Sequence, residues 1–155
     1  MTTFQKLRSD DDIREVVEVA FGMPLDIAGG WGYSKSSALI INQSKLPLEQ
    51  LEHTLASMRA QLEMNLTLPK EKRYGAININ ILHREVLESD KGRYEKVSFE
   101  ISAILEVQYA AFIEEYKAGL ERENFDIEAH FKRRKEATLK RNEIFWFEIK
   151  DALKL

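Results

Sequence analysis

Three histidines are the residues that first suggest chemistry, because each lies close to a glutamate and the two side chains together could hold a metal ion. The pairs are Glu49–His53, His83–Glu85 and Glu128–His130. Residues four apart share a helix face and residues two apart share a strand face, whereas residues two apart on a helix point about 200° away from each other. None of the pairs completes a metal motif. We therefore expect histidines that pack beside a charge, with no metal, no cofactor and no assigned catalytic residue.

A glycine-rich stretch at residues 29–33 is the second candidate site, because it carries two aromatic side chains on a backbone with unusual conformational freedom. One interpretation is a ligand or partner loop with Trp31 and Tyr33 as anchors. The other, which we favour, is a hairpin loop whose aromatic rings fold back over the edge of the core. The stretch lacks the Gly-Lys-Ser/Thr ending of a phosphate-binding loop.

Residues 132–141 contain six basic side chains and one glutamate, a composition that also occurs in segments that contact nucleic-acid phosphates. The basic residues pass part of the way round a helix and do not form a single face. Residues 100–123 offer six acidic partners, and the chain as a whole has a net charge of −3. We therefore expect no nucleic-acid binding and interpret the run as a solvated helix face beside an acidic neighbour.

The composition is that of an ordinary globular protein, with 44% hydrophobic and 32% charged residues among 155. This length predicts a single domain, 1–155, with a sizeable core. The lack of cysteine excludes disulfides and cysteine-ligated zinc and suits a reducing cytoplasm. No basic-then-apolar leader and no apolar run of about 18 residues occur, so we expect neither secretion nor a membrane partner.

The N-terminal half predicts short alternating elements. Three aspartates at 10–12 are typical of a helix start, and Gly22 ends that helix. Strands are expected over 25–28 and 37–42, and residues 2–8 form either a further strand or an irregular start. A helix over 47–64 follows, because its leucines recur at steps of three and four.

A strand over 75–82 is predicted by strict alternation, with isoleucines toward the core and asparagines toward solvent. The core-facing residues are Ile77, Ile79 and Ile81. A turn at 90–92 then leads into the C-terminal half.

Residues 93–153 are predicted to form two long antiparallel helices. The first helix has an apolar stripe at helical spacing: Tyr94, Val97, Ile101, Ile104, Leu105, Tyr109, Phe112, Tyr116 and Leu120. Asp126 is the expected N-cap of the second, after a loop at 121–126. Strands over 94–101 and 144–149 are the alternatives, because residues there also alternate.

These elements indicate an α+β fold. We expect a small sheet of three or four strands with helices on one face, followed by the long C-terminal antiparallel helical pair. The strand order cannot be derived from the sequence.

No family signature identifies a reaction, and we expect a non-enzymatic interaction or regulatory protein that self-associates as a homodimer through its C-terminal helices. The reason is the run Phe145, Trp146 and Phe147, which on a helix sweeps about 200°. One seam within the molecule covers little more than about 100°. At least one of these rings then needs a second surface, supplied by the sheet or, as we favour, by a second copy.

The alternative is a small-molecule-binding protein or an enzyme. Its pocket would lie between sheet and helices, gated by the loop at 29–33. The polar groups converging on such a pocket would be Asn78, Asn80 and His83.

Overall fold

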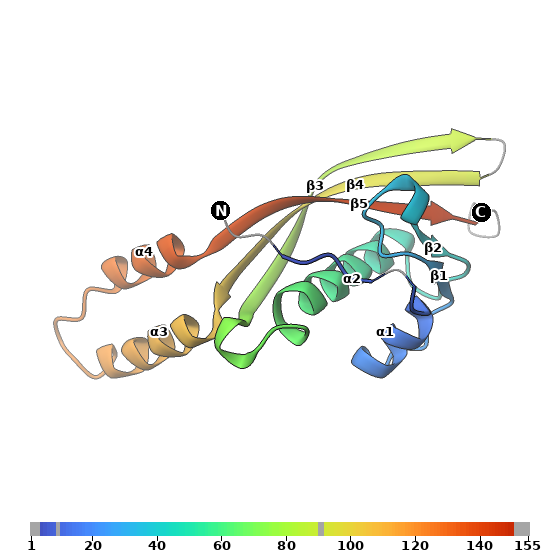
Figure 1. Ribbon diagram of the computed structural model, residues 1–155. Coiled ribbons are helices and arrows are strands. Elements are labelled where there is room, and N and C mark those ends of the chain that lie inside the picture. The colour runs from blue at the N-terminus through green and yellow to red at the C-terminus, as the bar shows by residue number, and fades with distance from the viewer. Residues whose placement is uncertain (1–3, 9, 90–91, 151–155) are drawn as a thin grey trace.

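The computed structural model describes residues 4–8, 10–89 and 92–150, and its framework is a five-stranded sheet (Figure 1). The strands are β1 (Ile27–Gly29), β2 (Leu39–Ile41), β3 (Tyr74–Ser89), β4 (Gly92–Leu105) and β5 (Leu139–Ile149). Their order across the sheet is β1-β2-β5-β4-β3. All neighbours are antiparallel except β2 and β5, which run parallel.

Four α-helices accompany this sheet in the described part of the chain. Two of them, α1 (Ile13–Phe21) and α2 (Leu48–Gln61), lie on one face, and α2 continues into a π-helical turn, Leu62–Leu66 (Figure 1). The other two, α3 (Glu106–Gly119) and α4 (Ile127–Ala137), form an antiparallel arm at one end of the sheet. No helix in these ranges is long and apolar enough to cross a membrane.

The helix ends follow from the sequence. The Asp12 side chain caps α1 by accepting from Arg14 N at 3.0 Å, and Gly22 ends it in the left-handed conformation. The predicted N-cap at Asp126 is confirmed, since its carboxylate accepts from Ala129 N at 3.0 Å.

The core lies between α1, α2 and the adjacent face of the sheet. Alternate residues of β4 and β5 point into it, among them Val97, Phe99 and Phe145, each no more than 2% exposed. The residues between them, such as Ser98 and Trp146, lie on the opposite face of the sheet, away from α1 and α2.

The prediction of two long helices over 93–153 is wrong. That stretch is divided about equally between strand and helix, and its helical pair extends only from Glu106 to Ala137, between β4 and β5. Both strands are rich in aromatic and β-branched residues and pair with each other along their length, and these cross-strand contacts outweigh the helical spacing of the apolar residues. The alternatives at 94–101 and 144–149 are therefore the structures found. Residues 151–155, into which the helical prediction extends, lie outside the described ranges.

The predicted sheet of three or four strands is too small because it omits β4 and β5. The α+β class is confirmed, with five strands in the sheet. Residues 4–8 are described and are not a strand, while residues 2–3 lie outside the description.

The elements of the N-terminal half lie close to their predicted places: α1 and α2 are helices, and β1 and β2 overlap the expected strands. β3 contains the strand predicted over 75–82 and runs on to Ser89. Of its three isoleucines only Ile79 is buried, at 6% exposed, whereas Ile81 is 48% exposed. The reason is that β3 is an edge strand whose register with β4 shifts between Ile81 and His83. Of the turn predicted at 90–92, residues 90–91 lie outside the described part.

The two faces of β3 should respond differently to substitution. Ile79→Ala should lower the free energy of unfolding by about 2–5 kcal/mol, because it removes a buried side chain from the core. Asn80 is the next residue, and its side chain is exposed. Asn80→Ser should therefore change the free energy of unfolding by less than about 0.5 kcal/mol. Urea unfolding followed by tryptophan fluorescence measures both. A large loss at Asn80 would show that the outer face carries a buried polar contact.

Candidate functional site

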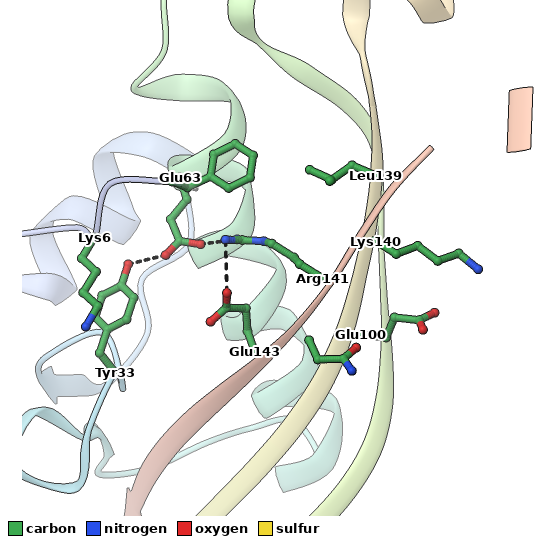
Figure 2. Close-up of a pocket in the computed structure, with 10 residues that line it drawn as sticks. Lys6, Tyr33, Glu63, Glu100, Leu139, Lys140, Arg141 and Glu143 are labelled. Carbon is green, nitrogen blue, oxygen red and sulfur yellow. Dashed lines mark hydrogen bonds and ion pairs between the residues drawn. The ribbon is translucent and has the colours of Figure 1, made fainter. Parts of the chain in front are cut away.

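A groove of about 830 Å³ runs beside β5. One side is formed by Phe4, Lys6, Tyr33 and Glu63, and the other by Glu100 and five consecutive residues of β5, 139–143 (Figure 2). Successive residues of a strand point to opposite faces. A hollow lined by every residue along such a run therefore follows the edge of the strand and not one of its faces.

The edge of β5 is bare along this groove. β4 pairs with β5 along its length, but on the other side β2 pairs only with residues 147–149. Trp146 N donates to Gly32 O at 2.8 Å, and Ile144 O accepts from Arg59 Nη1 at 3.4 Å. In an antiparallel pair alternate residues turn their N–H and C=O groups the same way. Lys140 and Asn142 therefore direct both backbone groups into the groove, where no described residue pairs with them.

The glycine loop at 29–33 continues the sheet beyond β2. Gly32 has a φ of +84°, and a Cβ there would lie 2.7 Å from Trp146 O, so only glycine allows this approach. The loop thus adds one hydrogen bond to the edge of β5 and then turns away. Trp31 packs in the core at 4% exposed, and Tyr33 forms the wall of the groove.

A buried charge network anchors that wall (Figure 2). The Glu63 carboxylate accepts from the Tyr33 hydroxyl and from Arg141 Nη2, and it lies 3.5 Å from Arg59 Nε. The Arg59 guanidinium lies between the rings of Tyr33 and Phe145, 4.0 and 3.8 Å from their centroids. Glu63 and Arg59 are 3% and 1% exposed, so their charges are compensated inside the protein.

The surroundings of the network set its protonation. Burial, and then the hydrogen bond to Glu63, raise the pKa of the Tyr33 hydroxyl above its usual value. Burial lowers the pKa of Arg59, and Glu63, Tyr33 and Glu143 oppose that shift. Tyr33 therefore remains a neutral hydrogen-bond donor at physiological pH. Both Glu63 oxygens accept a hydrogen bond, which leaves neither of them free for acid–base work.

The structure separates the residues that the sequence grouped as one ligand site. Tyr33 lines the groove, but Asn78, Asn80 and His83 lie on β3 at the other edge of the sheet, with β4 and β5 between. Their partners in β4 are Ser102, Glu100 and Ser98, which places them on the face away from the core.

The predicted self-association residues lie in β5. Phe145 and Phe147 are 2% and 1% exposed in the core, and Trp146 lies on the opposite face. Because successive side chains of a strand point to opposite faces, two of the three rings point into the core and the third points away from it. The helical sweep that suggested a second copy at these residues is absent.

Sequence reasoning missed the network behind the groove. Arg59 and Glu63 are four apart on a predicted helix, which is a usable signal for an ion pair. Arg141 and Glu143 are two apart, which places both on one face of a strand but on different faces of the helix predicted there. Because a helix was predicted at these positions, Arg141 and Glu143 were not recognised as members of the network.

A second buried charge cluster joins α2 to β3 and β4. Arg84 lies 2.8 Å from Glu52, 3.1 Å from Glu95 and 3.1 Å from Glu49. Glu52 and Glu95 are 0% and 1% exposed. Burial, and then the charge of Glu95, raise the pKa of Glu52 to about 8. Arg93 Nη2 also lies 3.2 Å from Glu95, whereas Arg84 is the cation that contacts Glu52, and Glu52 holds a proton at neutral pH.

The three histidine pairs are not gathered into a metal site. Within 4–8, 10–89 and 92–150, no three His, Asp or Glu side chains converge to hold a metal ion. His53 Nε2 lies 2.9 Å from Ile79 O, and His130 Nδ1 lies 3.1 Å from Glu115 Oε1. His83 is exposed on β3.

The protonated Glu52 makes stability depend on pH. Its pKa is about 8 in the folded chain against a reference of 4.5, so the unfolded chain ionises first as pH rises. The free energy of unfolding should therefore fall between about pH 5 and about pH 8. Glu52→Gln, which stays neutral, should be more stable than the parent at about pH 8 and should lose less over this range.

The exposed Glu49 provides the matched control, because it contacts the same arginine but is 79% exposed. Glu49→Gln should leave the pH dependence as it is in the parent. Urea unfolding at both ends of the range measures all three proteins. Equal slopes for Glu52→Gln and the parent would contradict a raised Glu52 pKa.

The network at Glu63 should be needed for stability. Glu63→Gln should cost about 3–5 kcal/mol, because it removes the buried counter-charge of Arg59 and leaves only Glu143, which lies 3.7 Å away and is partly exposed. Glu143→Gln, on a carboxylate that is 35% exposed, should cost about 0–1 kcal/mol. Urea unfolding compares the two, and equal losses would mean that Glu63 is not the centre of the network.

The groove has the features of a binding surface. Its buried charges are committed to one another, while the backbone edge of β5 stays open to a ligand. Comparison of the chain with family models, with curated proteins and with solved structures gave no match. The chemistry of the groove itself therefore has to indicate what it binds.

Proposed function

We propose that the protein is a non-enzymatic interaction protein whose groove holds an extended peptide as an added strand on β5. The observation that carries this proposal is the bare edge at Lys140 and Asn142, where backbone donors and acceptors face the hollow. An extended peptide satisfies such groups by continuing the hydrogen-bond ladder of the sheet. Exposed edges also invite unwanted pairing, and here the groove walls restrict access to one narrow segment.

The charges of the groove favour an acidic ligand. Figure 2 shows Lys140 and Glu100, which carry opposite charges, on the far side of β5 from Tyr33. Lys6 stands on the near side, with its ammonium 5.5 Å above the Tyr33 ring and no carboxylate in ion-pair distance among the described residues. A peptide carrying an acidic side chain would supply the missing partner.

Self-association is a separate proposal. Residues 145–147 do not support it, because they lie in β5. The surface of the α3–α4 arm supports it instead.

Asn142→Pro is the sharpest test of strand addition. Proline removes the N–H that faces the groove, and β4 does not use that N–H, so the sheet tolerates the change. Asn142→Ala keeps the backbone N–H and is the matched control. Peptides selected from a random display library on the parent protein should bind Asn142→Ala unchanged and lose about tenfold in affinity for Asn142→Pro.

Charge reversal at the groove wall gives a second readout. Lys6→Glu should weaken the selected peptides, which should be enriched in acidic residues. Thermal unfolding by circular dichroism checks that each variant is folded. The proposal fails if no peptide is enriched, if Asn142→Pro binds as the parent does, or if Asn142→Pro instead dissolves a dimer, which would make a second copy the occupant of this edge.

A further inference from the structure

The α3–α4 arm has an exposed apolar face that spans both of its helices. On α3 and just beyond it, a stripe at steps of four, three and four is formed by Tyr109, Ile113, Tyr116 and Leu120. The same spacing joins Ile127, Phe131 and Arg134 on α4 with Thr138, the C-cap of that helix. The two stripes adjoin, since the Tyr116 and Phe131 rings lie 5.7 Å apart and Arg134 lies 5.6 Å from the Tyr109 ring.

This face extends beyond the contact between the two helices, which shares Tyr116 and Phe131 with it. That contact is centred on His130, which is 0% exposed and whose ring lies between 5.2 and 5.8 Å from four aromatic rings. Leu120, Ile127 and Phe131, in contrast, are 61%, 41% and 46% exposed. The arm thus has one apolar seam closed by its own helices and a second apolar surface left open.

The charges of the arm are self-complementary. Helix α3 carries three glutamates and one lysine, while α4 carries four basic residues and two glutamates. Within the chain these charges meet across the seam chiefly at Glu115 and Arg133. Lys132 and Lys135 have no carboxylate within ion-pair distance in the described part of the chain. A second arm laid on the open face would bring an acidic helix to the unpaired lysines.

We infer that two copies of the chain pair through their arms in a four-helix bundle, with α3 of each copy over α4 of the other. Heptad-like stripes on two antiparallel helices suit this packing. Unlike charges meet only if the two-fold axis runs along the arms, because an axis across them would place α3 on α3. Both arms then point the same way, with their tips side by side and both sheets at the same end of the bundle.

The mass in solution tests the pairing. Light scattering from micromolar to tens of micromolar concentration should give twice the 18.0 kDa of the chain. Leu120→Asp and Ile127→Glu, on the open face, should each give a folded monomer. Val107→Glu is the matched control, because Val107 is 58% exposed on α3 but off the stripe, and it should leave the dimer intact.

The direction of the axis has its own test, which uses the absence of cysteine from the chain. Asn124→Cys places one thiol in the loop at the tip of the arm, and oxidation should link the two copies through it. Gln43→Cys, in the loop between β2 and α2, should give no link. A monomer at all concentrations, a dimer that survives both face variants, or a dimer without a tip link would each overturn the inference.

The proposal of peptide binding in the groove and the inference of a dimer through the arm are tested independently. Failure of the arm test changes the mass and leaves peptide binding at Asn142 as it was. If no peptide is enriched, or if Asn142→Pro binds as the parent does, the mass of the arm dimer is unchanged.

Discussion

The Glu63 carboxylate holds together three parts of the chain that are remote in sequence. It lies on the π-helical turn after α2 and receives a hydroxyl from the glycine loop and a guanidinium from β5. Arg59, one turn earlier, contacts the carbonyl oxygens of Trp31 and Ile144. The loop can therefore lie against β5 and still stop short of covering it. Buried charges need specific partners, so this network fixes where the loop lies beside β5. Apolar side chains at the same position would not impose such a fixed position.

The sequence predicts those parts of the fold whose order is local. The helices at 13–21 and 48–61 and the cap at Asp126 follow from spacing and end signals, because each depends on neighbours within a few residues. The arm's loop was also predictable, since Gly119 and the polar residues that follow Leu120 end the apolar stripe. The α+β class follows from these elements together.

The sequence does not predict what depends on strand pairing. In β4 and β5 the apolar residues fit a helix and a strand about equally well, and only pairing with neighbouring strands decides between them. The candidate site is the part that is hardest to predict from the sequence, because a bare strand edge can be recognised only when the strand order is known. Tyr33, which lines the groove, was named as a candidate because of its type and its glycine neighbours. Arg141 and Glu143 required the correct secondary structure.

The arm and the groove are joined by one residue of chain. α4 ends at Ala137 and β5 begins at Leu139, with Thr138 between them, its hydroxyl donating to Arg134 O at 2.8 Å. The first residues to leave the arm are also the first to line the groove. The arm is also held at the start of α3, where Glu106 N donates to Arg73 O at 2.9 Å and Asn65 Nδ2 donates to the Glu106 carboxylate at 2.6 Å. The strand that supplies the bare edge is thus entered directly from a helical arm that is anchored at the same end, with no loop of its own before the groove.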